Sequence, residues 1–373
     1  MSIQIRPVTD KKQEKTFIHF PWKIYENDPN WVPPLLMDIK LKLNKKKHPF
    51  YEFGEIQLFL AYKGEKTVGR IAAIQNKRYN EYHNCKTGFF GFFECINDQE
   101  VANALFDTAR GWLKAKGLNV LHGPASPSSN YDYGLLVEGF DDPPRLMMTY
   151  NPAYYPELFE KYGLKKATGL LAYRLKAETV LANKKLERVA NMVEKRYEVK
   201  MRPINMKNFF DEVKLIKKIY DNAWIDNWGF VPVSDAETEA LAKELKMVVE
   251  PKLAQFMLNK EGEVIGMFVA LPDFNAILKS FNGRLFPFNF LKMFFQKKKI
   301  KYVRIWALGL MPEYRNKGLD AIMYLTIIRN GMELGYRVGE ASWILEDNDM
   351  MNRGLEVVNG EIYKRYNVYE LSI

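Results

Sequence analysis

The sequence is poor in the residues that bind metals or form disulfides. Only two cysteines, Cys85 and Cys95, and four histidines occur among 373 residues. None of the CxxC, HxxxH and HExxH spacings that are typical of metal sites is present. We therefore expect neither a bound metal nor a catalytic thiol, and we expect a reducing compartment.

Long apolar runs are missing as well. No run of about 18 apolar residues occurs, so no transmembrane helix is predicted. The N-terminal sequence MSIQIRPVTDKKQEK lacks the apolar core of a signal peptide. Together these absences favour a cytoplasmic protein.

What remains is the composition of a globular protein, with 47% hydrophobic and 27% charged residues. A chain of 373 residues is expected to form two domains. The net charge of +10 suits an anionic ligand, which can be a phosphorylated cofactor, RNA or an acidic membrane surface.

The stretch 303–335 carries the clearest functional pattern. It predicts a buried strand over 303–310 and a helix over 319–335, separated by a polar loop that includes Arg315 and Gly318. Such a loop suits a phosphate group, because a helix start offers unpaired N–H groups and the positive end of its dipole. The GxxxxGK[ST] spacing is absent, so the loop is not a Walker loop.

This stretch resembles the acyl-CoA-binding motif of the GNAT acyltransferase superfamily, V-x-P-x-[YF]-R-x-x-G-x-[GA]. The matching residues here are Leu310, Pro312, Tyr314, Arg315 and Gly318. The resemblance implies that the loop holds the pyrophosphate of acetyl-CoA or another acyl-CoA, which serves as co-substrate, and that the strand binds the pantetheine arm. It assigns cofactor binding to Leu308, Leu310, Arg315, Asn316, Lys317, Gly318, Leu319 and Asp320. Asp320 departs from the motif, which has a small residue at this position.

The chain also contains an internal repeat. Arg6-Pro7 and Tyr25 return as Arg202-Pro203 and Tyr220, with separations that differ by one residue. Predicted hairpins around Gly69 and Gly266 continue the match. A repeat of this length indicates two copies of one fold. With the resemblance, it predicts an α/β (α+β) protein of two tandem GNAT-like mixed-sheet domains.

We predict a GNAT-like domain without a phosphate loop over 1–175, a helical linker over 176–198 and an acyl-CoA-binding GNAT-like domain over 199–373. The first copy has Asn97-Asp98-Gln99-Glu100 at the position of the loop. Acidic side chains cap a helix well but disfavour a bound pyrophosphate. Only the C-terminal copy is therefore expected to bind CoA.

The resemblance implies that an amine attacks the CoA thioester directly, with a base to remove a proton from the ammonium group. Glu340 and Glu346, which alternation places on one face of a strand, are candidate bases; a solvated surface or a structural ion pair is the alternative. The resemblance further implies that Asn348 contacts the CoA arm or orients the amine. The tyrosine that acts as general acid in the family is replaced by Glu356.

Candidate acceptor-binding residues come from three places. Trp228 lies in a region that borders the acceptor site in GNAT folds, with core packing as the alternative. An insertion, 124–148, carries Tyr131 and Tyr133, which either close the acceptor pocket or pack only on their own domain. A second insertion, 273–301, is rich in phenylalanine and lysine; a satellite core cluster is favoured there over an apolar substrate pocket or a membrane contact.

The leading hypothesis is an acyl-CoA-dependent acyltransferase, an N-acetyltransferase whose partner is a small-molecule or peptide amine and not a nucleic acid. A catalytically silent acyl-CoA-binding or regulatory protein is the second, because of Asp320 and the missing tyrosine. An aminoacyl-tRNA-dependent transferase is the third, since tandem GNAT-like folds also perform that chemistry. The intact loop 315–318 argues against the third. The acceptor, the acyl length and the oligomeric state stay open.

Overall fold

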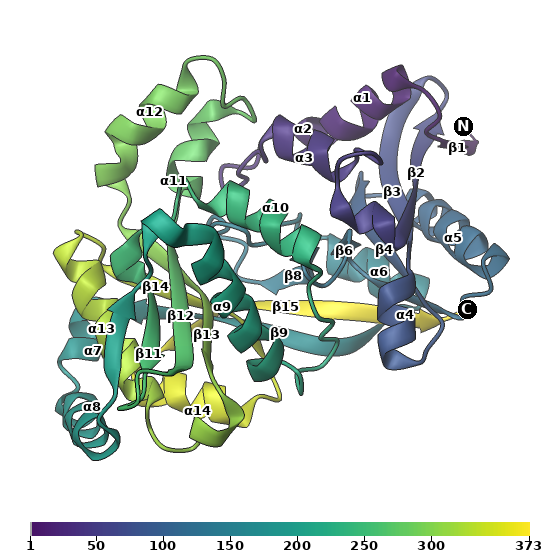
Figure 1. The fold of residues 1–373 in the computed structure, drawn as a ribbon. Coiled ribbons are helices and arrows are strands. Elements are labelled where there is room, and N and C mark those ends of the chain that lie inside the picture. Colours follow the sequence, from purple (N-terminus) through teal and green to yellow (C-terminus); the bar gives the residue numbers. More distant parts are fainter. Residues whose placement is uncertain (1) are drawn as a thin grey trace. The chain divides into compact units, whose positions relative to one another are not determined.

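The computed structural model describes residues 2–373, apart from the side chain of residue 294 (Figure 1). The chain forms two compact units. Unit 1 consists of Met1–Leu170, Leu278–Phe290 and Lys364–Ile373, and unit 2 consists of Leu171–Ile277 and Leu291–Tyr363. Each unit contains antiparallel and parallel strand pairs and buried hydrophobic residues.

The sheet of unit 1 has the strand order β1-β2-β3-β4-β5-β15. Its strands are β1 (Ile3–Pro7), β2 (Gly54–Lys63), β3 (Lys66–Asn76), β4 (Thr87–Cys95), β5 (Val120–Gly123), β8 (Leu135–Glu138) and the end of β15 (Glu361–Ser372), with a separate ribbon of β6 (Ala125–Ser126) and β7 (Asp132–Tyr133). Its helices are α1 (Lys11–His19), α2 (Pro21–Ile24), α3 (Leu36–Lys42), α4 (Lys77–His83), α5 (Gln99–Ala115) and α6 (Tyr155–Tyr162).

The sheet of unit 2 has the strand order β9-β14-β13-β12-β11-β10. Its strands are β9 (Lys165–Lys176), which starts in unit 1, β10 (Lys200–Pro203), β11 (Ala254–Leu258), β12 (Val264–Pro272), β13 (Tyr302–Leu310) and β14 (Val338–Leu345). Its helices are α7 (Ala177–Leu181), α8 (Lys184–Tyr197), α9 (Phe209–Ala223), α10 (Asp235–Leu245), α13 (Asp320–Glu333) and α14 (Asp349–Val357). The short helices α11 (Asn275–Leu278) and α12 (Asn289–Gln296) lie where the chain passes between the units.

The two units repeat one strand pattern, which confirms the predicted pair of GNAT-like mixed-sheet domains. In unit 1 the first three neighbouring pairs, from β1 to β4, are antiparallel and the pair β4–β5 is parallel. In unit 2 the pairs from β10 to β13 are antiparallel and the pair β13–β14 is parallel. In both units the helix between the two parallel strands, α5 or α13, makes the crossover.

The last strands do not follow the linear order of the repeat. From Lys364 onward β15 belongs to unit 1, where Tyr369–Ser372 pair with β5 and Arg365–Asn367 pair with β8. From Leu171 onward β9 belongs to unit 2, where it lies next to β14. Each unit is thus completed by a strand from the other half of the sequence. The proposed limits 1–175, 176–198 and 199–373 describe the linear repeat and stay a prediction.

Local sequence explains where the main helices start. Asp10 caps α1 with a capping box to Gln13, and Ser234 caps α10 with a capping box to Glu237. Asp98 caps α5, whose apolar face is buried against the sheet of unit 1. Helix α13 differs, because its N-cap residue, Leu319, offers no side-chain acceptor.

The segment predicted as a helical linker contains α7 and α8. The first insertion, 124–148, contains the short strands β6, β7 and β8, and the second, 273–301, contains α11 and α12. Within residues 2–373, none of the helices has the length and apolar character needed to cross a bilayer.

Candidate functional site

Strands β13 and β14 separate partway along their length. Their parallel pairing runs from Tyr302 with Val338 to Ile305 with Ala341. Beyond this point β13 continues to Leu310 and β14 to Leu345. Leu308 and Leu310 of β13 pair with Phe268 and Gly266 of β12. On the side of β13 that faces β14, these residues lie beyond the last residue pair, Ile305 with Ala341.

The loop between β13 and α13 presents backbone donors. A turn over Pro312–Tyr314 leads into it, and Asn316 and Gly318 have positive φ angles of 59° and 75°. Within the part of the chain that the structure describes, the N–H groups of residues 316–319 donate to no protein acceptor. Successive N–H groups without a protein acceptor at a helix start are chemically suited to an anion.

Arg315 is anchored to the end of helix α9. Its Nη2 atom donates to the carbonyl oxygens of Ala223 at 2.9 Å and Asn222 at 3.3 Å, and its Nη1 atom lies 3.4 Å from Oδ2 of Asp226. A guanidinium at a helix C-terminus satisfies carbonyl groups that have no partner inside the helix. Arg315 therefore positions the loop as well as adding positive charge to it.

Asp320 is directed toward helix α14. A Cβ atom added to Gly354 of α14 would lie 3.7 Å from Oδ2 of Asp320. Burial raises the pKa of this carboxyl group, and bonds from its own N–H and that of Ala321 oppose the shift. The carboxylate is thus directed at the start of α13 and at α14. Asp320, which replaces the small residue of the motif, therefore does not take up the N–H groups of residues 316–319.

Unit 1 has a different arrangement at the matching place. The pairing of β4 with β5 ends at Phe89 with His122, but the following space is filled by β6. The N–H of Phe92 donates to Oγ of Ser126 at 2.9 Å, and a Cβ atom on Gly91 would lie only 1.8 Å from the carbonyl oxygen of Ala125. At the start of α5, the capping carboxylate of Asp98 forms an ion pair with Lys63 at 2.5 Å.

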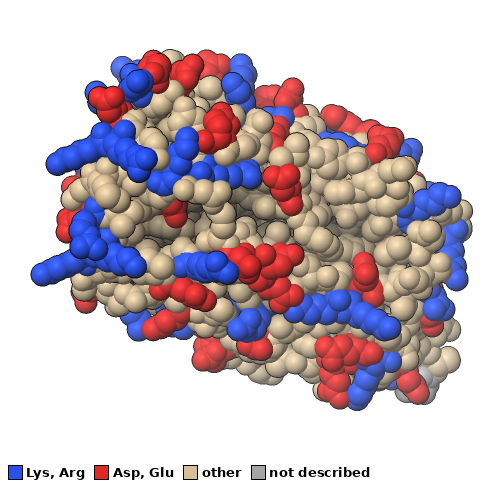
Figure 2. All heavy atoms as spheres, turned by 90° about the horizontal axis from the view of Figure 1, so that it is seen from below, with Lys and Arg blue, Asp and Glu red and all other residues tan. Residues whose placement is uncertain are grey.

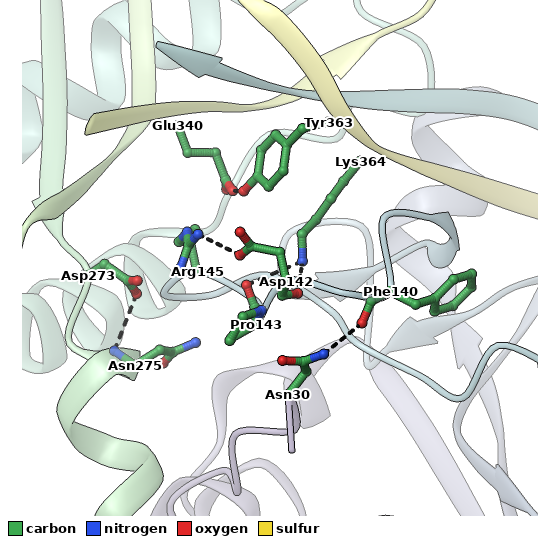
Figure 3. Close-up of polar contacts among 10 residues, drawn as sticks. All are labelled: Asn30, Phe140, Asp142, Pro143, Arg145, Asp273, Asn275, Glu340, Tyr363 and Lys364. Carbon is green, nitrogen blue, oxygen red and sulfur yellow. Dashed lines mark hydrogen bonds and ion pairs between the residues drawn. The ribbon is translucent and has the colours of Figure 1, made fainter. Parts of the chain in front are cut away.

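Glu340 lies in a buried polar network near the point where β13 and β14 separate (Figure 3). It is 1% exposed, and Oγ of Ser342 donates to its Oε1 atom at 2.6 Å. The hydroxyl of Tyr363 donates to Oε2. Arg304, also buried, has its Nε atom 2.9 Å from Oγ of Ser342 and 4.0 Å from Oε1 of Glu340. A buried carboxylate with these partners is fixed in position.

The other predicted catalytic residues lie outside this network. Glu346 follows the end of β14 and is exposed. Burial does not alternate along β14, since residues 340–342 are all buried. The side chain of Asn348 caps α14 by accepting a bond from the N–H of Met351 at 3.1 Å. This cap explains why an asparagine starts the last helix.

The predicted acceptor residues are distributed over both units. In unit 2, Trp228 is 37% exposed. Trp224, four residues earlier, packs on β13, because a Cβ atom on Gly309 would lie 2.6 Å from its ring. In unit 1, Tyr133 is buried with its hydroxyl 2.7 Å from Nε2 of His122, and Tyr131 packs against the ring of His48 at 5.2 Å. Burial raises the pKa of Tyr133 well above its usual value.

The first insertion is held in unit 1 by buried cations. Lys364 is 1% exposed, and its ammonium group donates to the carbonyl oxygens of Asp142 and Pro143 (Figure 3). Arg145 forms an ion pair with Asp142 at 2.5 Å. Carbonyl and carboxylate partners make it possible to bury such charges.

Sequence reasoning missed Tyr363 as a partner of Glu340. The residue follows the last helix and lies on β15, whereas the resemblance directed attention to tyrosines on the helix itself. Alternation along the strand places Tyr363 on one face with Arg365 and Asn367, which is a weak local signal. Its register against β14 depends on the whole sheet, which a local pattern does not define.

Comparison with known proteins adds a second line of observation. The chain is 34% identical to "Bacterial ceramide synthase" of Caulobacter vibrioides (strain NA1000 / CB15N), over 100% of this chain and 98% of that protein. It is 33% identical to "Protein YghO" of Escherichia coli (strain K12), over 99% of this chain and 95% of that protein. The chain belongs to the family of these two proteins. No protein-family model matches it.

The chain shares its fold with solved GNAT structures. A tandem GNAT protein from the clavulanic acid biosynthesis pathway matches 100% of this chain and 98% of its own, with a TM-score of 0.57 and 11% identity. A glucosamine N-acetyltransferase region of a fungal multi-domain enzyme matches 99% of this chain and 38% of its own, with a TM-score of 0.60 and 12% identity. At such identities the likeness concerns the fold alone.

Proposed function

We propose that this protein is an acyl-CoA-dependent N-acyltransferase that acylates the amine of a sphingoid base. The observation that carries the proposal is the 34% identity to a bacterial ceramide synthase along the entire chain. A ceramide is a long-chain amino alcohol whose nitrogen bears a fatty acyl group. The relative's name therefore favours a long-chain acyl-CoA as donor over the acetyl-CoA expected from the sequence.

The loop at the start of α13 supports an assignment of the CoA site to unit 2. Its free N–H groups at residues 316–319 suit a pyrophosphate, and Lys317 adds a charge beside the rings of Tyr314 and Tyr197. The open edge of β13 next to Leu308 and Leu310 suits the amide groups of the pantetheine arm. The matching place in unit 1 is occupied by β6 and Asp98, which supports one CoA site per chain.

The reaction needs one proton to be removed and one to be supplied. The amine nitrogen forms a bond to the thioester carbon, the carbon–sulfur bond breaks, and the proton lost by the amine finally resides on the CoA thiol. We assign proton removal to Glu340, because it is a buried carboxylate near the separation of β13 and β14. We assign proton donation to the CoA thiolate to Tyr363, whose hydroxyl donates a hydrogen bond to Glu340. It replaces the general-acid tyrosine that is missing from α14.

The direct test incubates the purified protein with palmitoyl-CoA and sphinganine, and in parallel with acetyl-CoA. Mass spectrometry detects the N-acyl product, and a thiol reagent measures the CoA released. We expect the amide with palmitoyl-CoA. If CoA binds but neither donor yields an amide with sphinganine, the proposal is wrong, and the catalytically silent alternative, which the exposed Glu356 on α14 favours, takes its place.

The proposed roles of Glu340 and Tyr363 are tested by isosteric variants. Glu340→Gln should lower kcat about 100-fold or more, and Tyr363→Phe about tenfold or more, because a positioned acid or base contributes roughly 10²–10⁴-fold. CoA affinity should be kept in both variants. Glu361→Gln, at an exposed position on the same strand as Tyr363, is the matched control and should keep its kcat. An unchanged kcat in Glu340→Gln contradicts the assignment.

A further inference from the structure

The segment around helix α12, whose place in the fold is shown in Figure 1, contains an unusual concentration of exposed large apolar side chains. Phe286 is 60% exposed, Phe288 75%, Leu291 57% and Phe295 81%. Among the described residues, Phe288 and Phe295 have the highest exposure of all the large hydrophobic side chains. Leu291 and Phe295 are four residues apart on α12 and therefore lie on the same side of the helix.

The orientation of this segment is set by other residues that are buried. Phe281 is 2%, Leu285 7% and Met293 6% exposed. The satellite core cluster that the sequence favours for 273–301 therefore fits these three buried residues. It does not describe Phe288 and Phe295, whose large apolar side chains lie in water.

Basic residues accompany the exposed phenylalanines. Between residues 274 and 301 the chain has seven Lys and Arg residues and no Asp or Glu. Lys292, Lys298, Lys299 and Lys301 are exposed, whereas Lys297 lies 3.3 Å from Glu250. The charge is mixed elsewhere: on the face drawn in Figure 2, Lys and Arg side chains lie among Asp and Glu side chains.

We infer that the segment 286–299 docks on an anionic lipid bilayer. Exposed phenylalanine and leucine can enter the boundary between headgroups and acyl chains, while lysines beside them pair with lipid phosphates and anionic headgroups. The absence of carboxylates over 274–301 removes the repulsion that an acidic side chain would add. This docking rests on the segment alone and does not depend on which acyl acceptor the protein uses.

The test measures co-sedimentation of the full chain with vesicles, in the absence of acyl-CoA. One set of vesicles is phosphatidylcholine mixed with phosphatidylglycerol, and the other is phosphatidylcholine alone. We expect binding to the mixed vesicles, much weaker binding to the neutral ones, and a loss of affinity with added salt. No binding to mixed vesicles would overturn the inference.

Two double variants separate the apolar and the charged contributions. Phe288→Ser with Phe295→Ser should weaken binding about tenfold or more, since two large apolar side chains no longer insert. Lys298→Gln with Lys299→Gln should weaken it roughly 25-fold, about fivefold for each lysine. All four positions are exposed, so the fold should be kept, which circular dichroism verifies.

The chain offers matched controls for both variants. Lys46→Gln with Lys47→Gln alters a second exposed lysine run, and Met37→Ser with Met247→Ser removes apolar side chains that are 50% and 56% exposed. Both controls should bind mixed vesicles as the unchanged protein does. Equal losses in the controls would overturn the inference. It is also overturned if light scattering finds a dimer that Phe288→Ser with Phe295→Ser dissociates, because the surface then belongs to a second copy of the chain.

Discussion

At the scale of single residues, the backbone of Gly318 is central to the proposed CoA site. Its φ angle of 75° is strained for any residue with a Cβ atom, although the nearest atoms, Cγ1 of Val193 and Val189, would be 3.5 and 3.7 Å from that atom. Gly318→Ala should therefore lower the unfolding free energy by about 1–2 kcal/mol and weaken CoA binding about tenfold, by shifting one N–H donor. Calorimetry and urea denaturation measure the two effects.

Gly117 is a matched control for Gly318. It has the same φ angle of 75°, it follows α5 in unit 1, and a Cβ atom there would meet nothing within 4 Å. Gly117→Ala should cost a similar amount of stability and leave CoA affinity unchanged. A similar loss of CoA affinity in both variants would contradict a site at the loop of unit 2.

Asp320 predicts a dependence of stability on pH. Burial raises the pKa of its carboxyl group above the ordinary 3.8, so the ionised form is less favourable in the folded protein than in the unfolded chain. Its contribution to stability therefore falls as pH rises from 3.8 through the raised value. Asp320→Asn should unfold at higher urea than the unchanged protein at neutral pH, and the gap should close below pH 3.8. A gap that does not vary with pH contradicts this cause.

The sequence predicted the local structure around the candidate site better than the long-range contacts of its residues. The loop that carries Arg315 and Gly318 and the helix after it were predictable because they are contiguous in the chain. The anchoring of Arg315 to Asn222 and Ala223 could not be predicted, since about 90 residues separate the partners and a local pattern does not define their distance. The bond between Tyr363 and Glu340 was missed for the same physical reason.

At the scale of secondary-structure elements, the contact of β4 with β6 distinguishes unit 1 from unit 2. A Cβ atom on Gly91 would overlap the carbonyl oxygen of Ala125, at 1.8 Å. Gly91→Ala should therefore lower the unfolding free energy by about 3 kcal/mol or more, because backbone must move. Gly111→Ala, at an exposed helical position in α5 with no neighbour within 4 Å, should instead stabilise by about 0.5–1 kcal/mol. Equal urea midpoints for the two variants would contradict the close contact.

The elements themselves were largely predictable, and their assignment to units was not. Hairpin patterns and helix caps indicated β2–β3, β11–β12 and α5, because these features depend on neighbouring residues. The placement of β15 after Lys364 in unit 1 depends on which sheet edge offers free backbone donors and acceptors. Both halves of a duplicated chain offer such an edge, so the sequence of one strand does not select between them.

At the scale of the whole molecule, duplication leaves two related units with unequal sites. Unit 2 has four free N–H groups at the start of α13, whereas unit 1 has the capping carboxylate of Asp98 and a filled space beside β4. In unit 1 the Asp98 carboxylate accepts hydrogen bonds from the N–H groups of Glu100 and Val101, which are then not available to a pyrophosphate. We therefore expect one CoA per chain in a calorimetric titration.

The same titration tests the asymmetry directly. Gly318→Glu places a carboxylate at the loop of unit 2 and should abolish measurable binding, because charge repulsion adds to the backbone strain. Asp98→Asn keeps a capping side chain and removes the negative charge from unit 1, and it should leave the stoichiometry at one. Two equivalents of CoA on the unchanged protein, or one equivalent retained by Gly318→Glu, would mean that unit 1 has kept a CoA site at another position.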